Sequence, residues 1–377
     1  MQLRAAPLVG ICLLALSNYL THANEPPMNS ASLDQLLETI RVEQDMPGFR
    51  AAVLMPDERL VRGVVGQGDI ENDVPLNHSI GMPGGSTGKT FVAALAMLLV
   101  EDGVFTLDDL AAQWVGDREW FAGLPNKDDM RIRHLLSHSS GMSDYPRTRK
   151  FLALQIWRAL RYGGISFERE ELIEMVTGIK PYFPVGEGFS YSDSGYIVLG
   201  MIIEAATGRD YYDLLRERIL EPHGFHEIQP QNQSVLSNIT PGYMRGARNL
   251  RADGTMKTNP ASEWTGGGLV TNPTMLVQFY RTLADGRIVS PESFERMRDA
   301  GWQNPESPGW HYGYGLFVTH KPAFIEHGGL WSGYRTHVRH YEKEQITISV
   351  QTNRDSVDLE SATDRVKQLI EREFMAL

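Results

Sequence analysis

A serine and a lysine three residues apart are the first pair in this 377-residue sequence with the chemistry of a catalyst: Ser86 and Lys89. Side chains three positions apart on a helix lie on one face, within reach of each other. A serine hydroxyl becomes a nucleophile when a base takes its proton, and a neutral lysine amine is such a base. Neutrality near pH 7 requires the lysine pKa to fall by about three units, roughly 4 kcal/mol. The pair predicts acyl transfer if burial supplies that shift.

Two other interpretations of this segment stay open at this point. Residues 83–90 read Pro-Gly-Gly-Ser-Thr-Gly-Lys-Thr, which is a phosphate-binding loop with Pro83 in place of its first glycine. Such a loop follows a strand, and residues 75–80 form a poor one. In the second alternative, Ser86 only caps a helix and Lys89 is solvated. Because Ser-x-x-Lys occurs by chance in most long chains, the choice depends on the rest of the sequence.

A buried helix is predicted directly after the pair. Residues 90–100 are apolar on every side and end at Glu101-Asp102-Gly103. The segment is too short to cross a bilayer, so it indicates a helix inside a protein core. Its apolar start would desolvate Lys89, and the positive end of its dipole would disfavour an ammonium and favour a developing alkoxide.

Strands are predicted at both ends of the chain and helices between them. Residues 30–43 and 359–374 read as amphipathic helices, and residues 107–241 as helices and loops. Strands at both ends imply one sheet domain, residues 24–100 and 250–377, interrupted by a mainly helical insertion, residues 101–249. The predicted strands cover residues 50–55, 59–65, 312–319, 323–327, 334–341 and 345–351.

The N-terminus and the composition limit the environment and the partners. A basic start at Arg4, an apolar run over residues 5–16 and small residues up to Ala23 are typical of a signal peptide, so we expect cleavage near Ala23 and a periplasmic or secreted protein. Cleavage would remove the lone cysteine, Cys12, and a single thiol forms no internal disulfide. The net charge of −11 and pI near 5.5 argue against binding nucleic acid or anionic lipid heads. The composition also argues against a stable membrane span and gives no oligomeric state.

Several ordered motifs along nearly the whole chain beyond the signal peptide carry a family resemblance. They read Gly-Gln-Gly-Asp at residues 66–69, Leu-Asp-Asp at 107–109, Ile-Arg-His-Leu-Leu-Ser-His-Ser-Ser-Gly-Met at 132–142, Pro-Val-Gly-Glu-Gly-Phe-Ser-Tyr-Ser-Asp-Ser-Gly-Tyr at 184–196 and Gly-Gly-Gly-Leu-Val at 266–270. With Ser86 and Lys89, this set resembles the serine beta-lactamase and penicillin-binding-protein superfamily. The resemblance is closest to its AmpC-type beta-lactamases, D-alanyl-D-alanine carboxypeptidases, D-aminopeptidases and related esterases. It implies an α/β (α+β) fold with a central antiparallel sheet flanked by helices.

The resemblance also implies the roles of individual residues. Ser86 is then the acylated nucleophile, Lys89 its base partner, and Tyr191 a proton relay at the position where a Tyr-x-Asn motif begins. Asp193 departs from that motif, which has asparagine there. A charged Asp193 would raise the pKa of Lys89 and oppose its service as a base, or would form an ion pair that positions Lys89 while Tyr191 acts as the base. Residues 192–194 are also one change from the Ser-Asp-Asn motif of another beta-lactamase branch.

The opposite wall of the expected site is His327-Gly328-Gly329, read as a strand end whose glycines let a substrate backbone lie flat. By the same resemblance, the backbone N–H groups of Ser86 and Leu330 form the oxyanion hole. A histidine here pulls less on a beta-lactam carboxylate than the lysine of related enzymes. His134 and His138 lack a matching set of ligands and are interpreted as structural, so no metal or cofactor is expected.

The sequence thus predicts an exported serine hydrolase for a small amide, a short D-peptide or an ester. A beta-lactamase and a non-catalytic penicillin- or peptidoglycan-binding protein on the same scaffold are the alternatives.

Overall fold

A large antiparallel sheet built from both ends of the chain organises the protein. The computed structural model describes residues 30–374, so the predicted signal peptide at residues 1–23 lies outside the described residues. The sheet order is β3-β2-β1-β13-β12-β11-β10-β9, which places the first and last strands of the chain side by side at its centre. The strands are β1 (Gly48–Leu54), β2 (Leu60–Asp69), β3 (Val74–Pro75), β9 (Trp310–Tyr312), β10 (Phe317–His320), β11 (Ala323–Trp331), β12 (Tyr334–Tyr341) and β13 (Ile346–Thr352).

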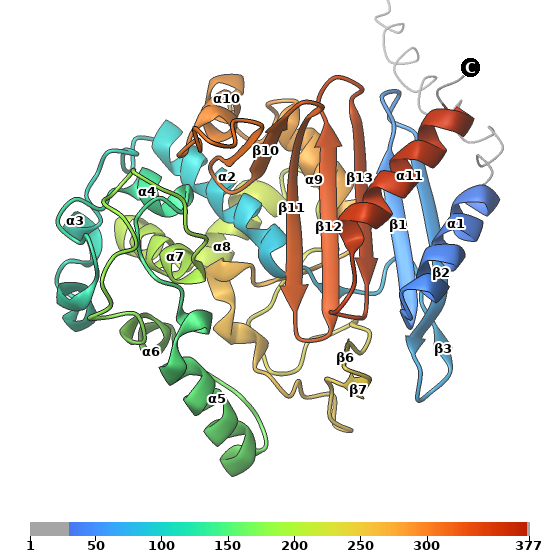
Figure 1. Ribbon diagram of the computed structural model, residues 1–377, viewed down its shortest axis with the longest axis horizontal. Helices are drawn as coiled ribbons and strands as arrows, with labels where there is room; N and C mark the ends of the chain where they lie inside the picture. Colours follow the sequence, from blue (N-terminus) through green and yellow to red (C-terminus); the bar gives the residue numbers. More distant parts are fainter. Residues whose placement is uncertain (1–29, 375–377) are drawn as a thin grey trace, which may run out of the picture.

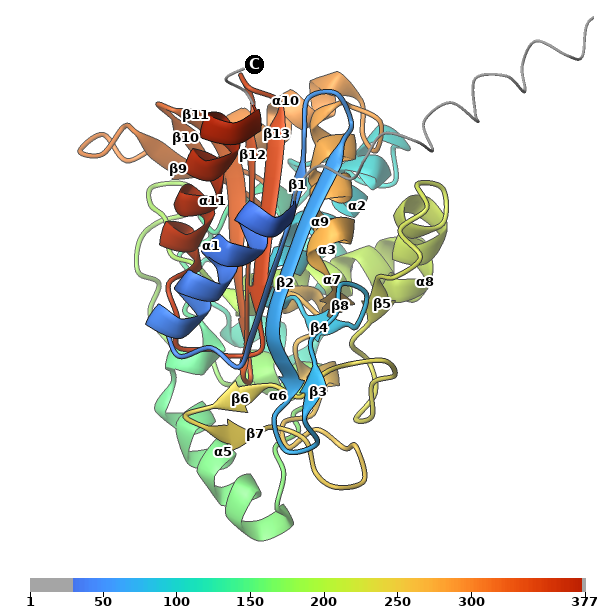
Figure 2. The same cartoon turned by 90° about the vertical axis from the view of Figure 1, so that its right-hand side faces the viewer.

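Helices cover both faces of this sheet. The terminal helices α1 (Ser30–Glu43) and α11 (Leu359–Phe374) pack side by side on one face, and α9 (Pro273–Ala284) packs on the other (Figures 1 and 2). The apolar stripe of α1, including Leu33, Leu37 and Ile40, is buried in the core beneath the terminal helices.

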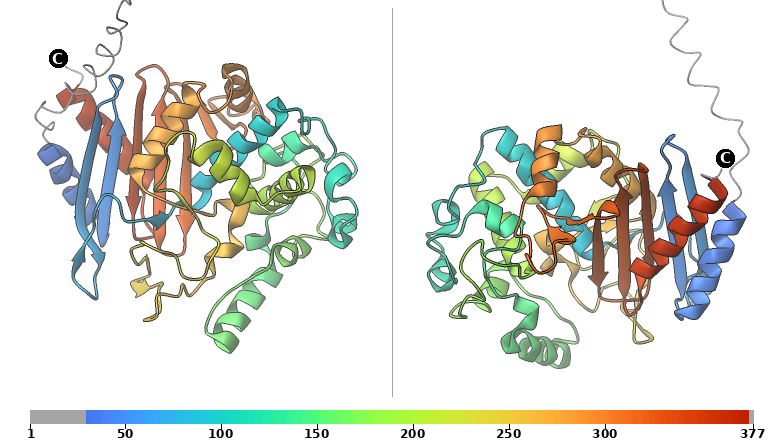
Figure 3. Two further views of the ribbon diagram at one scale, coloured as in Figure 1. Left: turned by 180° about the vertical axis from the view of Figure 1, so that it is seen from behind. Right: turned by 45° about the horizontal axis from the view of Figure 1, so that its top comes forward.

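The middle of the chain forms a mainly helical region beside the sheet. Helix α2 crosses this region toward the sheet (Figure 3). A single hydrophobic cluster extends from α2 through α7 and α9 to β11 and β12. The domain boundaries at residues 100 and 250 therefore stay a prediction. The remaining elements are α2 (Gly88–Glu101), α3 (Ala112–Val115), α4 (Ile132–Leu136), α5 (Arg149–Tyr162), α6 (Arg169–Glu174), α7 (Asp193–Thr207), α8 (Tyr211–Leu215), α10 (Pro291–Asp299), β4 (Met82–Pro83), β5 (Gln229–Pro230), β6 (Tyr243–Met244), β7 (Ala247–Arg248) and β8 (Leu269–Thr271).

The sequence predictions for the sheet need two corrections. Residues 312–319 form two strands, because a turn closed by a hydrogen bond from the Gly313 N–H to the Leu316 carbonyl (2.9 Å) reverses the chain between β9 and β10. The strand predicted to end at His327 continues to Trp331, because pairing with β12 extends to that residue. Within the described residues, no helix is long and apolar enough to cross a bilayer.

Candidate active site

Ser86 lies in a tight 3₁₀ turn (Gly85–Thr87) between the short strand β4 and the start of α2. The turn is fixed at both ends: the Gly84 N–H donates to the Leu269 carbonyl of β8 (2.8 Å), and the Thr87 hydroxyl donates to the Gly84 carbonyl (2.9 Å). Gly85 has a positive φ of 56°, which a glycine adopts without strain. The turn thus presents the serine at the N-terminal end of a helix that is buried from Gly88 to Leu99.

Lys89 connects the serine with two other parts of the chain. Its side chain is fully buried, and its Nζ donates to Ser86 Oγ (3.2 Å), to Asp193 Oδ1 (2.5 Å) and to the Gly266 carbonyl. Helix α2 approaches the 266–268 segment very closely, since a Cβ on Gly88 would lie 1.7 Å from the Gly267 carbonyl oxygen. The Lys89 amine therefore joins three parts of the chain: the start of α2, the N-terminus of α7 and the 266–268 segment.

The charge of Asp193 decides the protonation state of Lys89. Burial alone would lower the pKa of Lys89, but the Asp193 carboxylate and the nearby Tyr191 outweigh it, and the net shift is upward. The apolar start of α2 therefore does not yield a neutral amine, contrary to the expectation from burial alone. Both consequences expected of a charged Asp193 are present: the raised pKa of Lys89 and the ion pair.

The N-terminus of α7 holds Asp193 in place. Asp144 Oδ1 accepts hydrogen bonds from the backbone N–H groups of Asp193 (2.9 Å) and Ser194 (3.3 Å). Ser192 caps the same helix, since its Oγ accepts from the Gly195 N–H (3.2 Å). Burial, with the neighbouring Asp193 charge, raises the pKa of Asp144 to about 7. The choice between the tyrosine-type motif and the Ser-Asp-Asn type stays a prediction.

Tyr191 lies beside the lysine inside an aromatic cluster. The Lys89 Nζ is 4.9 Å from the centre of the Tyr191 ring. The centres of the His138 and Tyr191 rings are 4.2 Å apart. The buried hydroxyl of Tyr191 makes no hydrogen bond of normal length among the described residues. Burial raises the pKa of Tyr191 to about 12, although the Lys89 charge acts in the opposite direction. At rest, the site holds a protonated lysine and a neutral phenol.

His138 and His134 both act in the local structure. His138 Nδ1 accepts from the Ser192 N–H (3.1 Å), directly after Tyr191, and His134 Nδ1 accepts from the Arg131 N–H (3.1 Å) at the start of α4. Among residues 30–374, no group of three or more His, Cys, Asp or Glu side chains is arranged to hold a metal ion.

Strand β11 forms the opposite wall. Its neighbour β10 pairs with it only as far as Glu326, so the edge over residues 327–331 is left open on the side of Ser86. A Cβ on Gly85 would lie 2.4 Å from the Leu330 nitrogen, and one on Gly329 would lie 1.8 Å from the Gly84 carbonyl oxygen. The glycines thus bring the Leu330 amide directly against the turn that carries Ser86.

His327 is buried and neutral. Burial, followed by the Lys89 charge, lowers the pKa of His327 to about 3. Its ring nitrogens lie 2.7 Å from the Gly328 carbonyl and 3.1 Å from the Tyr312 hydroxyl. The imidazole therefore offers a substrate no positive charge.

A cavity of about 310 Å³ opens at this point and brings the predicted residues together. Its lining includes Ser86, Tyr191 and the 327–330 edge of β11. It also includes residues that the sequence analysis missed, because no motif distinguishes them: Phe317, Glu326, Arg335, His337 and Glu360. Arg335 pairs in register with Leu330, so it could have been placed only from the β11–β12 pairing.

Comparisons with known proteins were made for the whole chain. The sequence model of the family described as Beta-lactamase matches residues 33–371. The chain is 26% identical to penicillin-binding protein 4* of Bacillus subtilis, over 72% of this chain and 60% of that protein. It is 24% identical to the D-aminopeptidase of Gluconobacter oxydans, over 86% of this chain and 59% of that enzyme. The chain thus spans about three fifths of the length of these two relatives.

A solved structure has the same fold. A D-stereospecific amidohydrolase from Streptomyces sp. superposes with a TM-score of 0.76 at 24% sequence identity, over 93% of this chain and 99% of that one. At this identity the likeness concerns the fold.

Proposed function

The chain belongs to the beta-lactamase family, and on that basis we propose that it is a serine hydrolase that cleaves a small amide or short peptide carrying a D-residue through a covalent acyl-enzyme. The observation that carries the proposal is that Ser86 lines one cavity with Tyr191 and the open edge of β11, while the buried Lys89 contacts the Ser86 hydroxyl. The D-aminopeptidase and D-stereospecific amidohydrolase among the similar proteins support the substrate class.

The geometry supports a sequence of proton and acyl transfers. The Lys89–Tyr191 pair first loses one proton, because both members are protonated at rest. Ser86 Oγ then attacks the substrate carbonyl and gives its proton to that pair, while the N–H groups of Ser86 and Leu330 hold the oxyanion. The pair returns the proton to the leaving nitrogen, and water hydrolyses the ester bond to Ser86.

The charges around the cavity determine which residue could bind a substrate carboxylate. The neutral His327 offers nothing to the carboxylate of a beta-lactam. Arg335 is the cation of the cavity lining, and among the described residues it makes no ion pair. A peptide with a free C-terminal carboxylate would therefore depend on Arg335, whereas an amide or an ester would not.

Hydrolysis of a substrate panel tests the proposal. The panel comprises D-amino acid amides, D-Ala-D-Ala peptides, aryl esters and a chromogenic cephalosporin, each given to wild type, Ser86→Ala and Arg335→Gln. We expect wild type to cleave D-amides fastest and Ser86→Ala to cleave nothing. A carboxypeptidase would instead show a preference for free carboxylates that Arg335→Gln abolishes. Wild-type rates in folded Ser86→Ala would refute the proposal.

A penicillin- or peptidoglycan-binding protein without turnover is a second candidate, because the Asp193 ion pair keeps Lys89 charged. Such a protein would bind members of the panel and hydrolyse none. We also propose export through the signal peptide near Ala23, which N-terminal sequencing of the protein from its native host would test.

A further inference from the structure

Helix α5 projects from the body of the protein (Figure 1). It carries an exposed apolar face. The face consists of Leu152, Ile156, Trp157 and Leu160, and we call it the α5 apolar face. Leu160 is 83% exposed, and the other three are between 51% and 56% exposed. Leu152, Ile156 and Leu160 are spaced at four-residue intervals, so they form one stripe along the helix. None of the 14 residues of α5 is buried.

The opposite side of α5 is the side that holds it to the protein. Phe151 packs against Tyr145 and Phe167, with ring centroids 5.1 and 5.0 Å apart. Arg158 forms an ion pair with Glu171 and lies 4.4 Å from the centre of the Phe167 ring. These contacts orient the helix so that its apolar face points to solvent.

The charges of α5 have one sign. The helix contains Arg149, Lys150, Arg158 and Arg161 and no acidic residue, in a chain whose net charge is −11. Among the described residues, Arg149, Lys150 and Arg161 make no ion pair, and all three are exposed. Arg149 and Lys150 stand in the first turn, where the helix dipole disfavours cations, so helix stability does not explain them.

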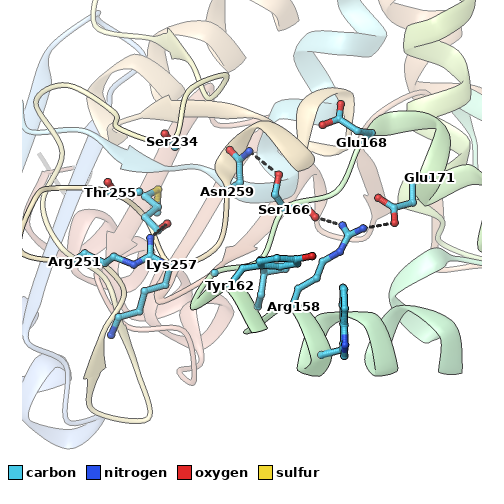
Figure 4. A pocket seen from close by; sticks show the side chains of 14 residues that line it. Arg158, Tyr162, Ser166, Glu168, Glu171, Ser234, Arg251, Thr255, Lys257 and Asn259 are labelled. Atoms are coloured by element: carbon cyan, nitrogen blue, oxygen red, sulfur yellow. Dashed lines mark hydrogen bonds and ion pairs between the residues drawn. The ribbon is translucent and has the colours of Figure 1, made fainter. Parts of the chain in front are cut away.

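A cavity of about 700 Å³ lies between α5 and the loop that follows β7 (Figure 4). The Arg158 side chain is joined to Glu171 on one side, and Arg251 and Lys257 stand on the other. Within the described part of the chain, neither Arg251 nor Lys257 forms an ion pair; both donate to backbone carbonyls, Lys257 to that of Arg248 (2.6 Å). The cavity lining thus contains the cations Arg158, Arg251 and Lys257 and the acids Glu168 and Glu171, of which Glu171 is paired with Arg158.

We propose that the α5 apolar face and its cations bind the surface of an anionic phospholipid bilayer, with α5 lying in the plane of the interface. Leucine, isoleucine and tryptophan beside basic residues are the composition of interfacial helices. At about 21 Å, the 14-residue helix is too short to span the hydrocarbon core. A second copy of the same face would bring Arg149, Lys150 and Arg161 of both copies together without an acidic partner on either helix, and the exposed stripe itself lies along a projecting helix outside the cavity lining, except for Trp157. An anionic bilayer satisfies both the apolar stripe and the charge.

The proposal revises the expectation from overall composition. The net charge predicts repulsion from anionic lipid, but the Debye length at physiological salt is only about 8 Å, so the local charge of α5 dominates at contact. The proposal is independent of the hydrolase activity, because no residue of α5 lines the cavity at Ser86.

Cosedimentation of the purified protein with vesicles tests the proposal. One set of vesicles contains phosphatidylglycerol and the other only phosphatidylcholine. We expect wild type to sediment with the anionic vesicles alone, and less as salt increases. Leu160→Glu, and separately Lys150→Gln/Arg161→Gln, should each lower binding about tenfold or more. The blue shift of tryptophan emission on binding should disappear in Trp157→Phe.

Matched controls separate this surface from general effects of charge and polarity. Val42→Glu changes an equally exposed apolar residue on α1, and Arg62→Gln/Lys343→Gln removes two exposed cations elsewhere. Both should bind like wild type, and all variants should keep the wild-type unfolding temperature.

Three outcomes would overturn the proposal. The first is wild-type protein that stays in solution with anionic vesicles or binds both vesicle types equally. The second is wild-type binding by Leu160→Glu. The third is a dimer, seen by sedimentation velocity without lipid, that Leu160→Glu dissociates, which would assign the face to a second copy.

Discussion

Asp193 has the greatest influence on the chemistry of the site at the scale of single residues. Its carboxylate lies 2.5 Å from Lys89 Nζ and keeps that amine protonated although it is fully buried. An asparagine here could hydrogen-bond to the lysine without adding charge. In the proposed mechanism, the Lys89–Tyr191 pair must therefore lose one proton before Ser86 is acylated. The rate of acylation should accordingly rise with pH through the neutral range.

Asp193→Asn should shift the pH profile of kcat/KM toward lower pH. Removing the carboxylate lowers the Lys89 pKa, so more of the Lys89–Tyr191 pair has lost its proton at pH 7, and D-amide turnover there should rise about tenfold or more. Initial rates from pH 6 to 10 measure the shift. The exposed Asp117→Asn serves as control and should leave the profile unchanged. An unshifted profile with no gain at pH 7 would show that Asp193 does not control the proton.

Backbone contact between two elements sets the geometry of the site at the next scale. Strand β11 approaches the turn before α2 so closely that only glycine fits at residue 329. This approach places the Leu330 amide beside Ser86, where the oxyanion would form. The proposed oxyanion hole thus depends on the packing of a strand against a turn more than 240 residues away in sequence.

Gly329→Ala should separate these two elements. The added Cβ would lie 1.8 Å from the Gly84 carbonyl oxygen, so backbone must move; we expect a loss of about 1–3 kcal/mol of stability. A displacement near 1 Å should also lower kcat about 100-fold. Gly309→Ala is the matched control, since a Cβ there meets nothing within 4 Å. Thermal unfolding and kcat are measured for both variants. Full activity in Gly329→Ala would contradict the proposal that the close contact of β11 with the turn before α2 forms the oxyanion hole.

The sequence was sufficient to predict the elements that have strong local patterns. The amphipathic helix at residues 30–43, the buried helix after Ser86 and the strands predicted over residues 334–341 and 345–351 follow from hydrophobic periodicity, and the last strand is observed as Ile346–Thr352. The two-glycine turn inside residues 312–319 was missed because aromatic and apolar residues flank it on both sides. Cavity residues such as Arg335 and Glu360 were missed because long-range pairing, which no local pattern encodes, brings them to Ser86.

Buried acids couple stability to pH at the scale of the whole molecule. Glu263 is buried beside the 266–268 segment and accepts a hydrogen bond from Gln231 Nε2 (2.7 Å). Burial raises the pKa of Glu263 to about 8. The folded state therefore holds this proton more tightly than the unfolded state does. The stabilisation is fully present below the unfolded pKa near 4.5 and is lost as pH rises through about 8.

Glu263→Gln should remove that loss and keep the hydrogen bond from Gln231. Relative to wild type, we expect little difference in unfolding free energy at pH 5 and a gain of about 5 kcal/mol at most above pH 8. Urea denaturation at pH 5, 7 and 9 gives the comparison. Glu306→Gln changes an exposed carboxyl and should track wild type at every pH. A variant less stable than wild type at pH 7 would mean that Glu263 is already charged, and stabilised in that form, in the folded protein at that pH.

At the scale of the whole molecule, folding brings α2, the start of α7 and the open edge of β11 around the Ser86 hydroxyl, which we propose to be reactive. The most direct measurement is the intact mass of the protein after exposure to a fluorophosphonate probe, followed by peptide mapping. The account predicts a single adduct on Ser86 in wild type, none in Ser86→Ala and much slower labelling in Lys89→Met. A folded wild-type protein that stays unlabelled, or that carries its adduct on another residue, would contradict it.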